Sequence, residues 1–370
     1  MWKIFENYEW EQLKNEFSWI RDMEGVPQDP VFHAEGDVEV HTQMVVKSLL
    51  ELDEYRQLNE QDKHILCAAA LLHDVEKRSV TVVEPDNRVT SKGHAKKGAF
   101  TTRAILYAEM GAPFYIREAV VKLVRYHGLP LWVFEKEDAA KAVIATSLEV
   151  NTWHLYILAK ADVLGRICPD KKDLLYRLDL FKELCHEQDC LGKPKQFPDG
   201  LSRFYYFTRK ESVPDFVPYD ETKFEVTMLS ALPGSGKDTY VSQNFTADFP
   251  VVSLDNIRRR LNIAPDDTKG NGRVVQEAKE QARGLMRKRQ SFIWNATNIT
   301  RAMREQLIGL FTSYGGKVKI VYLEVPYQTL LKQNSNREYN VPSEILHKMI
   351  RKLEVPSLSE AHEVDYVIRE

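Results

Sequence analysis

The first 200 residues alternate apolar and polar positions with the period of an α-helix. Between Val38 and Leu52, apolar residues recur every three or four positions, and an apolar stretch from Lys63 to Leu72 runs directly into His73. Further helical patterns cover Lys97–Glu109, Phe114–Tyr126, Ala139–Ser147, Leu155–Gly165 and Lys172–Glu187. Short polar turns separate these segments, without strand-like alternation of any length. This half of the chain is therefore predicted to be an all-α helical bundle.

From Lys223 onward the pattern changes to short apolar strands separated by helices. The predicted strands are Phe224–Leu229, Pro250–Leu254, Ser291–Asn295 and Lys317–Val325. The helical patterns that follow them are Asp238–Phe245, Asp255–Leu261, Val274–Arg289 and Ala302–Phe311. Such alternation predicts an α/β domain with a parallel sheet covered on both faces. We therefore expect a multidomain chain, with domains over residues 1–205 and 223–370 and an aromatic linker over residues 206–222.

Composition excludes several classes of protein. The 370 residues suit two or three domains, and 43% hydrophobic and 28% charged residues are ordinary for a globular chain. A net charge of -3 argues against bulk electrostatic capture of nucleic acid, although local basic patches stay open. The four cysteines form no Cys-x-x-Cys pair, which favours a reducing compartment and disfavours zinc on thiolates. Because the sequence has no leader-like or membrane-length apolar run, we expect a cytoplasmic protein without membrane contact.

Histidine and aspartate side chains recur through the helical half. Imidazole and carboxylate groups bind first-row divalent metals when several of them converge, and a His-Asp doublet at a helix end can direct both side chains into one cavity. A single histidine on an apolar face is more often a core residue than a ligand. The complete ordered set favours a metal site: His41, His73, Asp74, His94, His127 and Asp162.

This order resembles the H…HD…D motif of the HD phosphohydrolase superfamily over residues 30–165. The run from His33 to Thr42 is similar to the start of the HD domain attached to some bacterial tRNA nucleotidyltransferases. The resemblance implies 2′-phosphatase and 2′,3′-cyclic phosphodiesterase activity with a divalent transition metal such as Mn²⁺, Ni²⁺, Co²⁺, Zn²⁺ or Cu²⁺. It implies the following ligand sets: His41, His73, Asp74 and Asp162 for a first metal, with His94 and His127 completing a second.

The same resemblance implies roles for two neighbouring residues. Lys77 would hold a phosphate oxygen of the substrate. His33 would be a further ligand or a proton donor, and a structural loop histidine is the alternative. Whether one metal or two bind stays open.

A glycine-rich loop, Ala231 to Thr239, follows a predicted strand and precedes a helix. In this context glycines let backbone N–H groups turn toward phosphate, and a lysine reaches the β and γ oxygens of a nucleotide. The predicted phosphate-binding residues are Gly234, Ser235, Gly236, Lys237, Asp238 and Thr239. Asp238 stands where Ser or Thr normally contacts Mg²⁺, so the residue that orients this ion stays open.

Three charged residues that follow the loop in the sequence favour a kinase. Asp255 ends a predicted strand, where a carboxylate can accept the proton of an attacking hydroxyl. Arg258 can grip an acceptor-side phosphate, the alternative being a helix-terminal aspartate beside a solvated arginine. Arg337 suits a lid that closes over the transferring phosphate. The pattern resembles the 5′-OH polynucleotide kinases over residues 224–368, with Gln333 in place of the first lid arginine.

Both halves together resemble the bifunctional HD-Pnk family of bacterial RNA end-healing enzymes. This resemblance implies an N-terminal domain that opens and removes a 2′,3′-cyclic or 2′/3′-phosphate. It implies a C-terminal domain that phosphorylates the 5′-OH of RNA or DNA with Mg²⁺ and ATP or another NTP, in a pathway with an RNA ligase. A homodimer stays open. The alternatives are a free-nucleotide phosphohydrolase fused to a nucleoside or nucleotide kinase, and a nucleotide-gated module whose HD half only senses a ligand.

Overall fold

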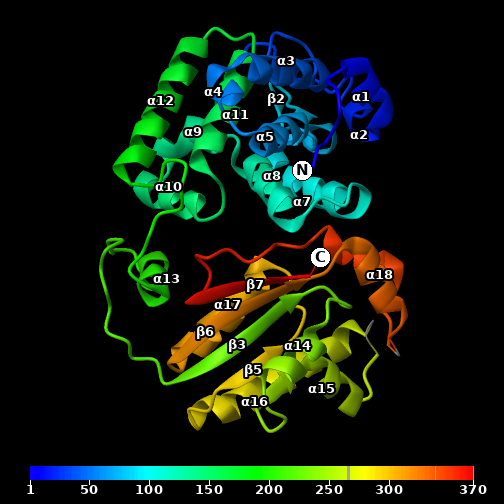
Figure 1. Ribbon diagram of the computed structural model, residues 1–370, viewed down its shortest axis with the longest axis vertical. Coiled ribbons are helices and arrows are strands. Elements are labelled where there is room, and N and C mark those ends of the chain that lie inside the picture. The colour runs from blue at the N-terminus through cyan, green and yellow to red at the C-terminus, as the bar shows by residue number, and fades with distance from the viewer. Residues whose placement is uncertain (265–266, 338, 370) are drawn as a thin grey trace. The chain divides into compact units, whose positions relative to one another are not determined.

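The chain folds into two compact units, Met1–Lys195 and Gln196–Glu370, in the computed structural model (Figure 1). The structure describes residues 1–264, 267–337 and 339–369. Residue 370, the last residue of the predicted second domain, lies outside this set. Within the described ranges, the helices are too short or too polar for any of them to cross a bilayer.

The first unit is a helical bundle, as the apolar pattern predicted. Its helices are α1 (Trp10–Glu16), α2 (Ser18–Arg21), α3 (Val38–Glu51), α4 (Asp53–Arg56), α5 (Glu60–Leu72), α6 (Lys77–Val80), α7 (His94–Ala104), α8 (Phe114–Tyr126), α9 (Leu129–Trp132), α10 (Ala139–Ser147), α11 (Thr152–Leu164) and α12 (Lys171–Glu187). A π-helical turn, η1 (Ile105–Glu109), continues α7, and a 3₁₀ turn, η2 (Val133–Glu135), follows α9. The unit also contains a short antiparallel hairpin that the pattern did not reveal, made of β1 (Val82–Val83) and β2 (Val89–Thr90).

Two of these helices begin earlier than their apolar patterns indicate, because polar residues cap them. The Asn59 side chain accepts a hydrogen bond from the backbone N–H of Asp62 at 3.0 Å, so α5 includes its first polar turn. The Asn151 side chain accepts hydrogen bonds from the backbone N–H groups of Trp153 and His154, so α11 also includes its first turn. Such caps satisfy N–H groups that have no partner within the helix.

Helices α3 and α11 approach each other closely at Gly165. A Cβ atom there would lie 2.8 Å from the backbone nitrogen of Val45, so only glycine fits without a shift. Because α3 carries His41 and α11 carries Asp162, this contact brings two predicted metal ligands together. Helix α5, whose residues 65–72 are all buried, lies in the same core.

The second unit contains a five-stranded parallel sheet in the order β4-β5-β3-β6-β7. Its strands are β3 (Phe224–Ala231), β4 (Val251–Ser253), β5 (Phe292–Asn295), β6 (Gly316–Glu324) and β7 (Glu363–Ile368). The apolar pattern predicted the first four and missed β7. This edge strand is only partly buried, and its Glu363 and Asp365 pair with Lys317 and Lys319 of β6. A half-exposed edge strand needs few apolar residues, so it gives a weak signal in the sequence.

Helices cover both faces of this sheet, as predicted. They are α13 (Gly200–Thr208), α14 (Lys237–Asn244), α15 (Leu254–Arg260), α16 (Thr268–Arg287), α17 (Arg301–Ser313), α18 (Tyr327–Ser335) and α19 (Ser343–Ile350). Along β3, Val226 and Met228 pack with α16 and α17, whereas Leu229 and Ala231 pack with α14. Successive strand residues point to opposite faces, so this alternation gives the sheet two separate apolar layers.

Helix α13 belongs to the second unit rather than to the helical bundle. Arg203 donates from Nε to the Leu358 carbonyl at 2.8 Å and from Nη2 to the His362 carbonyl at 2.9 Å. The ring of Phe204 stacks on His362 with centroids 4.1 Å apart. The compact units therefore divide at residues 195 and 196, earlier than the linker expected at 206–222, because an aromatic segment that reads as a connection packs on the sheet domain. The functional limits 1–205 and 223–370 stay predictions.

We expect His362 to make the stability of this unit depend on pH. Burial lowers the pKa of His362 to about 4, from an ordinary value of 6.5, and its Nδ1 accepts the Val318 N–H at 3.1 Å. As pH falls, the unfolded chain takes up this proton first, so the contribution is present above pH 6.5 and is lost toward pH 4. Urea unfolding of the full chain should lose up to about 3 kcal/mol over this window. His362→Gln keeps an acceptor but cannot titrate, so an equal loss in that variant would contradict the assignment.

Candidate functional site

Five elements of the first unit direct histidine and aspartate side chains to one place. Helix α3 supplies His41, the end of α5 supplies His73 and Asp74, and α11 supplies Asp162; His94 begins α7 and His127 follows α8. Their ligand atoms form two groups in which all atoms lie within 4.8 Å of one another: His41, His73 and Asp162, and Asp74, His94 and His127. The structure thus brings together all six predicted metal ligands.

Asp74 connects the two groups through its two carboxylate oxygens. Oδ2 lies 3.2 Å from His73 Nε2 and 3.7 Å from His41 Nε2. Oδ1 lies 3.3 Å from His94 Nε2 and 3.9 Å from His127 Nε2. A carboxylate in this position can contribute one oxygen to each of two ions.

Three histidines are oriented by backbone carbonyl oxygens at Nδ1. The Nδ1 atoms of His73, His94 and His127 lie 2.8, 2.7 and 2.9 Å from the backbone carbonyl oxygens of residues 70, 91 and 124. A carbonyl oxygen can only accept a hydrogen bond, so each Nδ1 carries the proton. In the neutral form of each ring, Nε2 then presents a lone pair, which is the arrangement that metal-binding histidines use.

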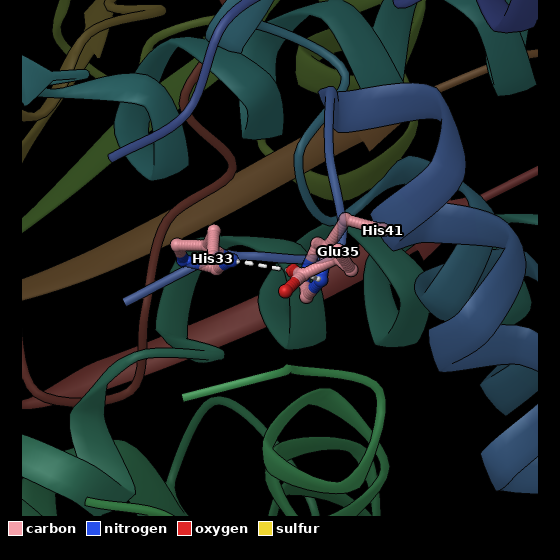
Figure 2. A group of neighbouring side chains, drawn as sticks. All are labelled: His33, Glu35 and His41. Carbon is pink, nitrogen blue, oxygen red and sulfur yellow. Dashed lines mark hydrogen bonds and ion pairs between the residues drawn. The ribbon is translucent and has the colours of Figure 1, made fainter. Parts of the chain in front are cut away.

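His41 is oriented by a glutamate that the sequence did not single out. Oε1 of Glu35 lies 2.8 Å from Nδ1 of His41 and 2.8 Å from Nδ1 of His33 (Figure 2). Oε2 accepts the backbone N–H of Ile167 at 2.8 Å, just beyond α11. Burial raises the pKa of Glu35, but hydrogen bonds from the two histidines outweigh it and hold the pKa below its usual range. The His-x-Glu spacing of His33 and Glu35 was the only sequence signal for this residue.

The cluster fits a divalent metal chemically. Nε2 of His41, Nε2 of His73 and Oδ1 of Asp74 are buried without a hydrogen bond partner among the described residues, a costly state unless something binds them. Burial raises the pKa of Asp74 and of Asp162, but Lys77 and Arg166, respectively, outweigh it and keep both carboxyls ionised. Burial beside His94 lowers the pKa of His127 to about 3. Ionised carboxylates and neutral imidazoles are the states that metal binding requires.

A cavity of about 320 Å³ opens next to this cluster, with His33, Lys77, His94 and Arg166 in its lining. Nζ of Lys77 lies 2.7 Å from Asp74 Oδ2 and donates to Gln28 at 2.8 Å. Arg166 donates to both oxygens of Asp162, at 2.9 and 2.5 Å. Sequence reasoning missed Arg166, although its spacing of four residues from Asp162 on a helical pattern was a usable signal.

Replacing Glu35 should weaken metal binding. Glu35→Gln keeps the size of the side chain but removes the charge that holds His41 in its tautomer, so we expect metal affinity to fall by roughly ten- to a hundredfold. Titration calorimetry of the metal-depleted full chain with Mn²⁺ measures this directly. Glu137→Gln changes an exposed glutamate of the same unit and serves as the control. Equal affinities in the two variants would contradict the orienting role.

The glycine-rich loop of the second unit joins the end of β3 to the start of α14. Gly234 and Gly236 adopt φ of +88° and +85°, a region that favours glycine. A Cβ on Gly234 would lie 3.2 Å from the backbone of α18, so the loop passes close to that helix. Ser235 is buried, whereas Asp238 and Thr239 are exposed in the first turn of α14.

Four charged side chains of the predicted kinase site interact electrostatically near the loop. Burial lowers the pKa of Lys237 to about 8, with opposing contributions from Asp255 and Arg337, and Nζ donates to the Leu232 carbonyl at 3.3 Å. Oδ2 of Asp255 lies 3.9 Å from Nη2 of Arg337. Oδ1 of Asp255 accepts from Arg258 at 2.5 Å. The structure therefore brings the predicted lysine, carboxylate and two arginines into one neighbourhood at the carboxyl ends of β3 and β4.

Asparagines position parts of this site that sequence reasoning left undefined. Asn295, at the end of β5, donates to Asp238 Oδ1 at 2.8 Å. Asn334 of α18, three residues before Arg337, binds both backbone groups of Val341, at 2.7 and 3.1 Å. Gln333, which replaces an arginine in the expected lid pattern, is exposed on α18. Asn298 donates to the Leu229 carbonyl at 2.6 Å and is buried, which gives it a structural role between β3 and the segment after β5.

Comparison with known proteins identifies both units. A family model described as HD domain matches residues 38–164, and one described as AAA domain matches residues 226–356. The chain therefore combines an N-terminal helical HD domain with a C-terminal AAA-type P-loop kinase domain. Each model covers about a third of the chain.

Among curated proteins, the chain is similar to the L-seryl-tRNA(Sec) kinase of Methanococcus maripaludis, with 24% identity over 141 residues. This match covers 35% of the chain and 52% of the relative, so the chain spans about half the length of the relative it matches. Among solved structures, it is similar to the Pnkp1/Rnl/Hen1 RNA repair complex, at TM-score 0.32 and 18% identity over 38% of this chain and 47% of that one. A sugar kinase from Janibacter sp. gives TM-score 0.30 and 17% identity over 39% and 85% of the two chains. Structural likenesses of this size carry no argument about substrate.

Proposed function

We propose that the chain is a bifunctional nucleic-acid end-healing enzyme. Its HD domain would act as a 2′,3′-cyclic phosphodiesterase and 2′(3′)-phosphatase, and its P-loop domain as an NTP-dependent 5′-OH polynucleotide kinase. The observation that supports this proposal is the presence of two chemically distinct clusters of side chains in one chain. One holds a histidine–aspartate cluster beside a basic cavity, and the other a glycine loop beside an acceptor-side carboxylate and arginine.

In the HD domain, the chain's own residues hold and neutralise the phosphate end. His41, His73, Asp74 and Asp162 would ligate one divalent ion, and His94 and His127 with Asp74 a second. A metal bound there supplies a Lewis acid for the phosphoryl oxygens and lowers the pKa of a bound water. Lys77, 2.7 Å from Asp74, is positioned to bind a phosphate oxygen of the substrate. His33 lines the cavity and can donate or accept a proton at Nε2, because Glu35 accepts from its Nδ1.

In the kinase domain, the residues near the glycine loop divide the work of phosphoryl transfer. Asp255 accepts the proton of the attacking 5′-OH, and Lys237 and Arg337 neutralise charge on the transferred phosphoryl group. Mg²⁺ bound with the NTP would supply further positive charge for the phosphate groups. Asp238 and Thr239 are the two candidates to orient this ion, and the hydrogen bond from Asn295 holds Asp238 in place.

Arg258 favours a polynucleotide acceptor over a free nucleoside. It lies against Asp255 and its Nε donates to Asn271 at 3.2 Å, so its guanidinium is held beside the proposed base. An internucleotide phosphate next to a 5′-OH terminus would offer this arginine a bidentate partner, whereas a free nucleoside offers none. The curated relative, an L-seryl-tRNA(Sec) kinase, is named for an acceptor carried by RNA, which agrees with a nucleic-acid acceptor for this chain.

Two substrates test the proposal together. The full chain with ATP and Mg²⁺ should transfer phosphate to a 5′-OH oligoribonucleotide and not to a free nucleoside. With Mn²⁺, Ni²⁺ or Co²⁺ it should release inorganic phosphate from a 2′,3′-cyclic or 2′-phosphate end. Transfer only to nucleosides would favour a free-nucleotide enzyme instead. Binding of a 2′,3′-cyclic nucleotide without any turnover across the metal panel would favour a ligand-sensing HD domain.

The proposal also sets the biological context. Healed RNA ends are substrates for a ligase, so we propose RNA or DNA ends as substrates, an RNA ligase as functional partner and the cytoplasm as location. The relative rates on matched RNA and DNA oligonucleotides would define which ends the enzyme prefers.

A further inference from the structure

Two large aromatic side chains lie exposed at the cavity of the HD domain. Phe32 is 51% exposed and Trp132 is 44% exposed, and both line the same cavity as Lys77, His94 and Arg166. Exposed aromatic rings beside a polar cavity mark ligand-binding surfaces, because they gain most when something covers them. None of the phosphate chemistry described above uses either ring.

Both aromatic residues lie close in sequence to histidines of the candidate metal site. Phe32 directly precedes His33, and Trp132 ends α9, a short helix that begins two residues after His127. The guanidinium of Arg177, on α12, lies 4.7 Å from the centre of the Trp132 ring and restricts its position. A ligand that reaches from the phosphate-binding side chains toward the cavity mouth would therefore meet these rings.

We propose that Phe32 and Trp132 form a stacking subsite for the nucleobase of the terminal nucleotide whose phosphate enters the HD site. This inference rests on the proposed function and names the feature that selects a nucleotide over a simple phosphate ester. Terminal bases of single-stranded RNA are free to stack on aromatic side chains. Stacking strengthens binding by roughly ten- to a hundredfold per base and tolerates every base, which suits an enzyme that repairs breaks of any sequence.

The remaining polar groups of the cavity agree with a nucleoside occupant. Asp29 and Asp170 also line it. A carboxylate oxygen can accept a hydrogen bond from a sugar hydroxyl or a base amino group. The cavity thus combines cationic groups for phosphate, acceptors for hydroxyl or amino donors and aromatic rings for a base.

Binding measurements separate the base from the phosphate. Trp132→Ala and Phe32→Ala should each raise the Kd for a non-hydrolysable phosphonate analogue of adenosine 3′-monophosphate by roughly tenfold, measured by calorimetry on the Mn²⁺-loaded full chain. The Kd for inorganic phosphate should stay unchanged. Trp132→Phe keeps a stacking ring and should bind nearly as the wild type does. Phe134→Ala is the matched control, because Phe134 is 52% exposed but does not line the cavity.

Each outcome decides a separate question. An unchanged Kd for the nucleotide in both alanine variants would overturn the stacking subsite, as would equal losses for nucleotide and inorganic phosphate. Wild-type protein that binds both ligands equally tightly would overturn it too. Failure of the wild type to hydrolyse any 2′,3′-cyclic or 2′/3′-phosphate end would instead overturn the proposed function, while leaving the binding comparison valid.

Discussion

Asp74→Ala is expected to abolish phosphate release by the HD domain and to leave kinase activity intact. Asp74 places one oxygen 3.2 Å from His73 Nε2 and the other 3.3 Å from His94 Nε2, so its loss removes a ligand from both groups of the cluster. Loss of a residue that only supports a metal ligand typically costs 10–100-fold in affinity or activity. Removal of the shared carboxylate should therefore lower phosphate release by more than about a hundredfold. Phosphate release from a 2′,3′-cyclic end and transfer to a 5′-OH oligonucleotide measure the two activities on the same preparation.

The variant also disturbs a buried charge cluster, so its fold needs a separate check. Without Asp74, Lys77 loses a carboxylate 2.7 Å away and becomes a buried cation with fewer partners. Asp74→Asn keeps the side-chain volume and should show the same loss of hydrolysis with a smaller change in thermal unfolding. Asp173→Ala, at an exposed aspartate of α12, is the control. Hydrolysis that survives in Asp74→Asn would exclude Asp74 as a shared ligand.

The helical half shows how far residue spacing predicts a site and where it stops. The six ligands were predicted because each is a chemically distinctive residue in an ordered motif, and the structure brings all six together. Glu35 was missed because it acts through His41, by a contact that depends on packing. Arg166 was missed although its spacing of four residues from Asp162 gave a usable signal. Glu35 reaches His41 across a loop, and it also binds the N–H of Ile167, 132 residues further along the chain.

In the second unit, too, the sequence predicted some helices and strands and missed others. Strands β3, β4, β5 and β6 were predicted because most of their residues are buried and apolar. Strand β7 and helix α13 were missed. Acidic residues alternate with apolar ones along β7, and α13 is short and rich in aromatic residues, so both sequences resemble connecting segments. Their partners lie far along the chain: β7 pairs with β6, and α13 packs on His362. Local pattern therefore predicted the core, while the edges required knowledge of what packs against them.

Lys237→Ala is expected to produce the reverse of the Asp74 variant, with kinase activity lost and phosphate release retained. The ammonium of Lys237 lies at the start of α14 behind a glycine loop, where it can neutralise charge on the transferred phosphoryl group. Removal of one such stabilising group typically costs a hundred- to a thousandfold in rate, and we expect a loss of about that size. Lys288→Ala removes an exposed lysine from the same unit and should leave both activities unchanged.

Thermal unfolding distinguishes this effect from simple unfolding of the kinase domain. Burial lowers the pKa of Lys237 to about 8 from 10.5, so the protonated side chain is unfavourable in the nucleotide-free fold at pH 7. Its removal should therefore not lower the unfolding temperature of the free protein. ATP binding should stabilise the wild type by mass action, by about 2.7 kcal/mol at a hundred times Kd, and this stabilisation should shrink in Lys237→Ala. A variant that keeps the full ATP-dependent shift and the full kinase rate would show that Lys237 does not contact the nucleotide phosphates.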